Sequence, residues 1–345
     1  MAKMRTLVVD KDGVLSFREA PIPKCGPKEA LVKTIAGGLC GTDVKLIHHS
    51  FKGVPMSDYP LMLGHEGVGK VVEIGAEVKG LKIGDNVLLP FVGPIEEEGL
   101  GSAWGALSEY AIVHDPAAYT AENPPPDVAY AQTVLAEDID PVDAVTFVTF
   151  REVLSAIHYF GIKPEDCVVV FGCGPVGLAF IKLLSLSGCK DIIAVDIVDE
   201  KLKDAKTNGA KITLNNLNAD VTAAVRAEHP NGVRYVLDAV GLPSVANQAM
   251  PILADRGSVL CYGVLAKNEI TIDFSEASYN WNFICQQMPE KKEEAAAHDQ
   301  ILQWVRSGDL VMKDFISDYF TFDEAIVAHE KLLNLEIMKK AIIKF

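Results

Sequence analysis

The sequence predicts a two-domain α/β protein in which an irregular β domain is followed by a doubly wound parallel-sheet domain. Three observations predict it: a chain of 345 residues, short strand-like runs over the first 120 residues, and alternating strands and helices after Pro164. A chain of that length is long for one hydrophobic core and sufficient for two. Its composition, with 49% hydrophobic and 23% charged residues, is ordinary for a globular enzyme.

Residues 1–150 form the expected first domain. Strand-like runs such as 30–35 and 69–74 stand between Gly and Pro residues, which is typical of short strands joined by turns. The pattern predicts an irregular and largely antiparallel β region. A helix is expected from about 141 to 160, where the first domain ends.

Residues 151–288 form the expected second domain. Its strand-like runs are 167–171, 192–196, 235–239 and 258–262. Helical segments separate these runs, and strands that alternate with helices imply a parallel sheet covered on both faces. From about residue 289 the chain returns to a helix and a final strand, so we expect 289–345 to rejoin the first domain.

Charge and cysteine usage restrict the partners and the compartment. A formal net charge of -15, without any Lys/Arg run, makes nucleic acid an unexpected partner. The longest apolar stretch, 167–186, is interrupted by glycines and a proline and carries Lys182, so no membrane helix is expected there. Seven scattered cysteines, with no C-x-x-C pair and no secretory signal, indicate reduced thiols and a cytoplasmic protein.

A glycine-rich turn indicates a dinucleotide site. Gly172-Cys173-Gly174-Pro175-Val176-Gly177 matches G-x-G-x-x-G, follows a predicted strand and opens a helix. The glycines permit a tight turn and a close approach of the backbone to a pyrophosphate, whose charge the helix N-terminus stabilises. Asp196, at the end of the next strand, can accept hydrogen bonds from the adenosine ribose. A purely structural glycine turn is the alternative interpretation.

Asp196 favours NAD over NADP, because a carboxylate at that position would repel a 2′-phosphate. Ile197 and Val198 supply no arginine that would offset the repulsion. Lys201 is a candidate cofactor-binding cation, with a solvent-facing lysine as the alternative. NAD is therefore the expected cofactor.

Two short motifs in the first domain carry possible metal ligands. Gly38-Leu39-Cys40-Gly41-Thr42-Asp43 is followed, 25 residues after the cysteine, by Gly64-His65-Glu66-Gly67. Thiolate, imidazole and carboxylate groups bind zinc, and three protein ligands with one open position describe a catalytic rather than a structural site. Taken singly, a lone cysteine or histidine is more often a core residue, which is the alternative for each.

These motifs and the glycine turn together resemble the medium-chain zinc-dependent alcohol dehydrogenase superfamily, which combines a GroES-like catalytic domain with a Rossmann domain. Gly41-Thr42-Asp43-Val44 is most similar to the sorbitol, butanediol and threonine dehydrogenase branch, and Gly84-Asp85-Asn86-Val87 matches the family's G-D-x-V strand. The resemblance covers nearly the whole chain. It implies an enzyme that transfers a hydride between a secondary alcohol or polyol and NAD, and a homodimer or homotetramer.

The resemblance also implies roles for individual residues. One catalytic Zn²⁺ is bound by Cys40 and His65, with Glu66 as a ligand or near-ligand. The Thr42 hydroxyl relays the substrate proton, and the Asp43 carboxylate orients the zinc-bound histidine. Zinc lowers the pKa of bound water and should act on a bound alcohol in the same way, after which hydride passes to the nicotinamide.

Three positions depart from the family pattern. The family's structural zinc lobe needs four closely spaced cysteines, and segment 91–115 has none, so we expect one zinc per chain. The further metal ligand before the nucleotide domain falls on Glu152 or, in an ungapped comparison, on Arg151; of these only Glu152 suits a metal, and a surface carboxylate is its alternative. Lys45 stands where many relatives carry a relay histidine.

Two other functions stay open on the sequence alone. A zinc-free NAD(P)-linked carbonyl or enoyl reductase of the same superfamily is one, although the presence of both Cys40 and His65 argues against it. A non-catalytic dinucleotide-binding protein is the other, and an intact Thr42 beside those residues argues against that. Substrate identity depends on pocket shape, so a polyol, vicinal diol, cyclitol, sugar phosphate or amino alcohol remains open, with the absence of an arginine cluster disfavouring phosphorylated substrates.

Overall fold

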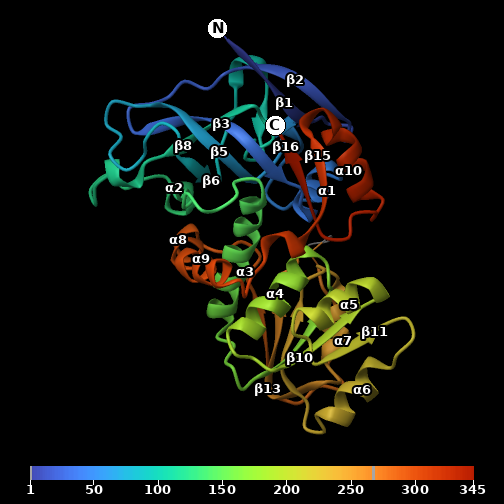
Figure 1. Ribbon diagram of the computed structural model, residues 1–345. Coiled ribbons are helices and arrows are strands. Elements are labelled where there is room, and N and C mark those ends of the chain that lie inside the picture. Colours follow the sequence, from blue (N-terminus) through green and yellow to red (C-terminus); the bar gives the residue numbers. More distant parts are fainter. Residues whose placement is uncertain (1, 266–268) are drawn as a thin grey trace. The chain divides into compact units, whose positions relative to one another are not determined.

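The computed structural model describes residues 2–265 and 269–345 and divides into two compact units (Figure 1). The first unit comprises the chain up to Arg151 together with Glu290–Leu302 and Val311–Phe345. The second unit comprises Glu152–Pro289 and Gln303–Leu310. Each unit carries its own sheets, so each is described by itself.

The first unit is built on two sheets of mostly short strands. One has the strand order β2-β1-β4-β7, and the other has the order β15-β16-β3-β5-β6 with β8 also paired to β3. All described pairs are antiparallel except β4–β7 and β15–β16, in agreement with the expected antiparallel region. The strands are β1 (Lys3–Val9), β2 (Leu15–Pro21), β3 (Glu29–Gly38), β4 (Leu61–Met62), β5 (Glu66–Ile74), β6 (Asn86–Leu88), β7 (Gly101–Ser102), β8 (Tyr110–His114), β15 (Ile316–Thr321) and β16 (Lys340–Lys344).

Short helices close the first unit around its sheets. They are α1 (Gly41–Ile47), α2 (Val128–Ala131), α8 (Lys291–Ala296) and α10 (Ala325–Leu333), while α3 (Thr146–Phe160) and α9 (His298–Ser307) continue into the second unit. Short 3₁₀ turns lie at Met56–Asp58, Glu96–Glu98, Pro116–Ala118, Asp143–Val145, Met312–Phe315 and Phe322–Glu324. One core cluster packs Leu7 of β1, Ala328 of α10 and Ile343 of β16 together, so the first and last strands share one interior.

The end of the chain is held in the first unit by backbone pairing. β16 runs antiparallel to β3, with Ile342 opposite Gly38 and Lys344 opposite Ala36. The last strand therefore extends the same sheet as β3 and β5, although more than 260 residues separate it from them along the chain. This pairing positions a residue of the candidate site described below.

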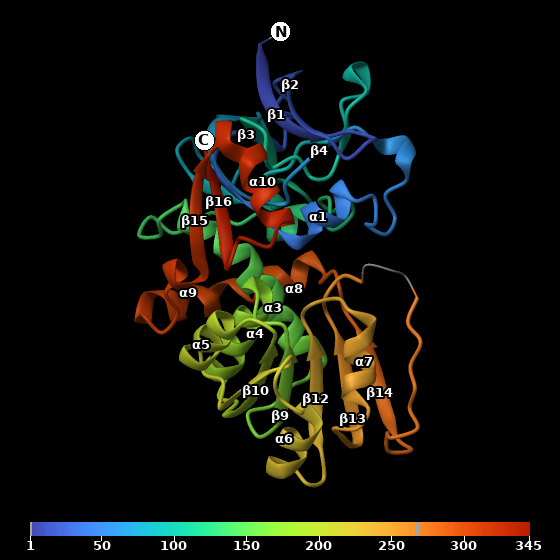
Figure 2. The ribbon, with the colours of Figure 1, turned by 90° about the vertical axis from the view of Figure 1, so that its right-hand side faces the viewer.

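The second unit contains a six-stranded parallel sheet in the order β11-β10-β9-β12-β13-β14. Its strands are β9 (Cys167–Phe171), β10 (Asp191–Asp196), β11 (Ile212–Asn215), β12 (Val233–Asp238), β13 (Leu253–Cys261) and β14 (Trp281–Cys285), and its helices are α4 (Pro175–Leu186), α5 (Asp199–Thr207), α6 (Val221–Glu228) and α7 (Pro243–Ala249). Figure 2 shows β9, β12, β13 and β14 side by side, with α7 against the sheet. This order is that of a dinucleotide-binding doubly wound fold, so the predicted fold class is confirmed.

The central strand shows why the sequence adopts this architecture. β9 reads Cys-Val-Val-Val-Phe and is buried along its whole length, as expected for a strand covered on both faces. The glycine turn then separates it from the 12-residue helix α4. The apolar stretch 167–186 is thus a strand followed by a helix, and no helix among the described residues is long and apolar enough to span a membrane.

Candidate metal and dinucleotide sites

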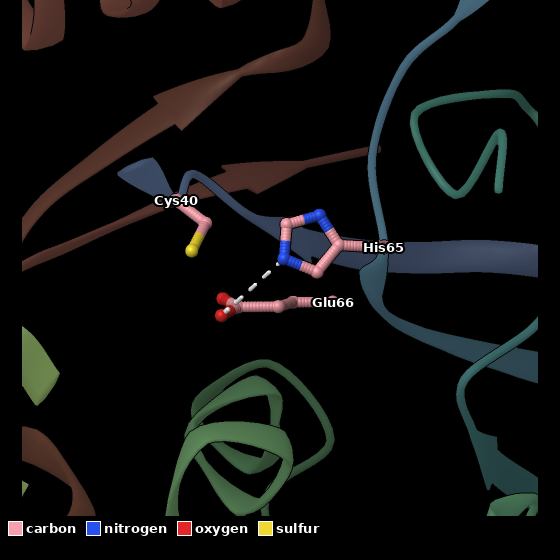
Figure 3. Close-up of side chains that lie close together, drawn as sticks. All are labelled: Cys40, His65 and Glu66. Carbon is pink, nitrogen blue, oxygen red and sulfur yellow. Dashed lines mark ion pairs between the residues drawn. The ribbon is translucent and has the colours of Figure 1, made fainter. Parts of the chain in front are cut away.

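Strand pairing brings the two metal-ligand motifs together. β3 ends at Gly38 and β5 begins at Glu66, and these two residues are direct partners in the antiparallel ladder. Cys40 follows the end of β3 and His65 precedes β5, so residues 25 apart in sequence become neighbours. Donor atoms of Cys40, His65 and Glu66 lie within 4.8 Å of one another, and Figure 3 shows their side chains pointing toward a common position.

The helix that follows β3 holds both Cys40 and Asp43. Cys40 is the N-cap of α1, and its backbone N–H donates to Asp43 Oδ2 at 2.9 Å. The other oxygen, Asp43 Oδ1, is buried and makes no hydrogen bond with a described residue, and the same holds for His65 Nδ1. These two atoms lie 4.0 Å apart. The opposite ring nitrogen, His65 Nε2, lies 4.0 Å from Glu66 Oε1. Asp43 therefore faces one side of the imidazole and the ligand cluster faces the other.

The cluster attracts positive charge. Burial by itself would lower the pKa of His65, but its contact with the Cys40 sulfur and the charges of Asp43 and Glu66 outweigh burial and raise the pKa to about 10. A proton on the imidazole is one source of positive charge at this position. A metal cation would take the place of that proton, because metal binding requires deprotonated ligands.

Glu66 is held by two residues that the sequence analysis did not identify. Its buried carboxylate accepts hydrogen bonds from Lys340 Nζ at 2.7 Å and 2.5 Å, one to each oxygen. Thr149 of α3 donates its hydroxyl to Glu66 Oε1 at 3.3 Å. A Cβ on Gly38 would come within 2.5 Å of Glu66 Oε2, so glycine at that position makes room for the carboxylate. No local motif marks Lys340 or Thr149, because each reaches Glu66 only through tertiary contacts.

Further side chains surround the cluster. Thr42 is half-buried on α1 and its hydroxyl oxygen lies 3.9 Å from Cys40 Sγ, in reach of a group bound at the cluster. The Trp104 ring lies 5.4 Å from the His65 ring, a contact that no sequence motif predicts. Lys45, at the position of the family's relay histidine, is half-buried, and burial lowers its pKa.

The two candidates for a further metal ligand lie in different environments. Arg151 is fully buried, donates to the Ala131 carbonyl at 2.8 Å and lies 3.9 Å from the Glu294 carboxylate. It is therefore an internal cation that holds segments of the first unit together. Glu152 is half-buried and is the first residue of the second unit, so its role as a metal ligand stays a prediction.

The three glycines of the turn meet three different structural demands. Gly172 has φ +93, which favours glycine, and a Cβ on Gly177 would lie 1.8 Å from the Gly172 carbonyl oxygen. A Cβ on Gly174 would meet nothing within 4 Å, so the space in front of the α4 N-terminus is open. This combination of a tight turn, an open approach and close helix packing suits a bound pyrophosphate. Pro175 and Val176 begin α4 and are half-buried beside that space.

Asp196 ends β10 beside the glycine turn. Its carboxylate accepts backbone hydrogen bonds from Cys173 at 2.6 Å, Ile197 at 2.7 Å and Val198 at 3.0 Å. A carboxylate offers about four acceptor positions, so capacity for one ribose hydroxyl remains. Lys201 lies on α5 and is half-buried. Contacts of Asp196 and Lys201 with a cofactor stay predictions.

Comparisons with known proteins agree with this arrangement. The chain matches the family model of the alcohol dehydrogenase GroES-like domain over residues 26–124 and that of the zinc-binding dehydrogenase over residues 175–284. It is 30% identical over 272 residues to an L-threonine 3-dehydrogenase of Caldanaerobacter subterraneus, covering 74% of each chain. It is 26% identical to a D-xylulose reductase of Saccharomyces cerevisiae, covering 96% of this chain and 94% of the relative. The crystal structure of 2R,3R-butanediol dehydrogenase from Bacillus subtilis has the same fold, with a TM-score of 0.80, 21% identity and 99% of each chain covered.

Proposed function

The chain belongs to the medium-chain zinc-dependent alcohol dehydrogenase superfamily, in its sorbitol, butanediol and threonine dehydrogenase branch, and we propose that it transfers a hydride between a secondary alcohol or polyol and NAD at a zinc site. The observation that carries the proposal is the convergence of Cys40, His65 and Glu66 within the alcohol dehydrogenase domain. Family membership supports an alcohol oxidoreductase in general. The cluster supports the particular metal site.

The residues of the cluster fit a zinc ion. Sulfur, imidazole nitrogen and carboxylate oxygen are its usual donors. Cys40 and His65 would hold the ion, with Glu66 as third ligand or near-ligand and Glu152 as a further candidate. The buried Asp43 Oδ1, which bonds no described residue, would accept a hydrogen bond from His65 Nδ1 and leave Nε2 for the metal. A zinc ion bound there supplies a Lewis acid that favours loss of the proton from an alcohol hydroxyl.

The chain's own residues handle the substrate proton and the charge. Thr42 Oγ1 would accept the proton of the substrate hydroxyl, a role supported by its 3.9 Å distance from Cys40 Sγ. Lys340 would balance the Glu66 carboxylate, which leaves the cluster less negative than its ligands alone would make it. The Trp104 ring beside His65 would shield one side of the imidazole from water.

NAD is the proposed cofactor. The glycine turn, with its open approach at Gly174, would take the pyrophosphate. Asp196 would accept a hydrogen bond from the adenosine ribose and repel a 2′-phosphate. Lys201 is the only one of the proposed cofactor-binding residues that carries a positive charge, so it is the residue to test if NADP is used.

The two alternative functions are less well supported. A zinc-free reductase has no use for Cys40 and His65 with Asp43 behind the imidazole, an arrangement that serves a metal. A non-catalytic dinucleotide-binding protein has no use for Thr42 beside that cluster. We further propose that the protein is cytoplasmic, since all seven cysteines are free thiols, and that it forms a homodimer or homotetramer, as the resemblance implies.

The experiment that tests the proposal is NAD reduction by the zinc-loaded protein with a panel of polyols, vicinal diols, cyclitols and simple secondary alcohols. We expect a rate with at least one class, and a loss of roughly 10³-fold in Cys40→Ala, since metal polarisation contributes several kcal/mol to the transition state. Cys25→Ala is the matched control, because the Cys25 thiol of the same unit donates to the Glu29 carbonyl and lies in no ligand cluster of the described residues. Equal rates in Cys40→Ala and the parent protein would refute the metal site, and carbonyl reduction without zinc would support the zinc-free reductase.

A further inference from the structure

A second group of metal-ligand side chains lies in the other unit, at the edge of the parallel sheet opposite the glycine turn. Cys167 is the first residue of β9, and Asp191 is the first residue of β10 and its direct partner in the ladder. His229 caps the end of α6, just before β12. The amino ends of parallel strands meet at one edge of a sheet, so these three residues come together there. The glycine turn follows the carboxyl end of β9, a strand length away.

The three side chains converge on one position. His229 Nε2 lies 3.3 Å from Cys167 Sγ and 3.3 Å from Asp191 Oδ2, and one donor atom from each residue lies within 4.8 Å of the others. Tetrahedral zinc with bonds of about 2.3 Å to sulfur and about 2.0 Å to nitrogen and oxygen places sulfur and nitrogen about 3.5 Å apart, and nitrogen and oxygen about 3.3 Å apart. The observed separations match both edges of such a tetrahedron.

The surroundings allow a cation to enter and to be balanced. The side chains of Asp191 and His229 are 31% and 18% exposed, so solvent reaches the site, while the Cys167 thiol is buried behind them. Lys211 Nζ binds Asp191 Oδ1 at 3.1 Å, which leaves Oδ2 directed at the histidine, and the Glu228 carboxylate lies 3.7 Å from the same amine. Asp191 and Glu228 carry two negative charges against the single positive charge of Lys211, so this group of side chains does not repel a cation.

We propose that Cys167, Asp191 and His229 form a second metal site, which binds one zinc-class divalent cation through Sγ, Nε2 and Oδ2. Thiolate sulfur, imidazole nitrogen and carboxylate oxygen are the usual donors to zinc, and here one atom of each kind lies within 4.8 Å of the other two. The ion would tie β9, β10 and the α6–β12 turn together at the amino edge of the sheet. Its role is stabilisation of the second unit, and it is separate from the proposed catalytic zinc because its ligands belong to the other unit.

This site is not the cysteine-rich zinc lobe that the sequence analysis found missing. That lobe would lie in segment 91–115, in the first unit, where the sequence holds no cysteine. The proposed ligands come instead from three elements of the parallel sheet, and their order along the chain, 167, 191 and 229, matches no short metal motif. Only the fold brings them together.

The test is zinc stoichiometry of the full-length protein, reconstituted with zinc and passed through a weak chelator. We expect about two zinc ions per chain in the parent protein and about one in Cys167→Ser, in His229→Gln and in Cys40→Ser, with none in Cys40→Ser/His229→Gln. Cys189→Ser is the matched control, because that thiol is also buried near the same sheet edge but donates to the Asp166 carbonyl; it should keep about two. Far-UV circular dichroism shows whether each variant is folded, and the partly exposed His229 keeps the test available if Cys167→Ser does not fold.

Cobalt in the Cys40→Ser background gives a second measurement. Of the two ligand clusters found among the described residues, only the second then keeps its cysteine, so we expect a sulfur-to-cobalt charge-transfer band that is lost in Cys40→Ser/Cys167→Ser and in Cys40→Ser/His229→Gln. Zinc should also raise the unfolding temperature of Cys40→Ser, and this rise should be absent in the double variant Cys40→Ser/His229→Gln. One zinc per chain that disappears in Cys40→Ser and persists in Cys167→Ser and His229→Gln would overturn the proposal. Two zinc ions with one persisting in Cys40→Ser would support it, whatever the activity of the enzyme.

Discussion

Replacement of Lys340 by methionine leaves the buried Glu66 carboxylate without its counter-charge. The side chains of both residues are only 2% exposed, and Lys340 Nζ contacts both carboxylate oxygens at 2.7 Å or less. Removal of one partner of a buried ion pair costs about 3–5 kcal/mol, because the remaining charge is desolvated and unpaired. The hydrogen bond from Thr149 is already present in the parent protein, so it does not offset this loss.

The assay is thermal unfolding of the metal-free protein in a chelator, so that no cation can replace the lysine. A loss of 3–5 kcal/mol corresponds to a fall of roughly 10 °C in the unfolding temperature for a domain of this size. Lys344→Met, on the exposed face of the same strand, is the control and should lower it by about 2 °C or less. In the double variant Glu66→Gln/Lys340→Met the two losses should be far from additive. A Lys340→Met protein as stable as Lys344→Met, or additive losses in the double variant, would refute the buried pair.

Three further outcomes are expected. Gly174→Ala should leave the unfolding temperature unchanged but weaken NAD binding at least about tenfold by fluorescence titration, whereas Gly177→Ala should destabilise the fold because its Cβ meets backbone at 1.8 Å; equal NAD affinity of Gly174→Ala and the parent protein would contradict this. Asp43→Asn should weaken zinc binding roughly 10–100-fold in a competition titration, because it weakens the group that faces His65 Nδ1; unchanged affinity would show that Asp43 does not orient the ring. Burial first, and Arg151 second, lower the pKa of His298 to about 4. As the pH falls, the unfolded chain, with a histidine pKa near 6.5, therefore takes up the proton before the folded one. The free energy of unfolding of the parent protein should fall by about 2 kcal/mol between pH 7 and pH 5, and this fall should be absent in His298→Gln. Parallel pH profiles for the two proteins would exclude a contribution from His298.

The fold class followed from local patterns. Continuous apolar runs such as β9 and the helices between them predicted a covered parallel sheet, and the structure has one in the order β11-β10-β9-β12-β13-β14. The irregular β region likewise followed from short runs between Gly and Pro residues. These signals work because strand and helix periodicity and turn chemistry depend on neighbouring residues.

The candidate sites were predictable only in part. The glycine turn and the Cys40 and His65 motifs could be recognised because each is a short segment with a chemical meaning of its own. Their partners could not, since Lys340 reaches Glu66 through the register of β16 on β3, and Thr149 reaches it through the packing of α3. Trp104 beside His65 had no distinguishing signal either.

By itself the sequence determined the two-domain α/β architecture, the dinucleotide turn and the first metal-ligand pair, since these depend on residue types at short and regular spacings. Tertiary structure alone decided which charges are paired in the interior and which thiol meets which imidazole. The buried contact of Glu66 with Lys340 spans 274 residues, and Cys167 meets His229 across 62. Such contacts depend on strand register and helix packing, which the whole chain determines together and no local pattern records.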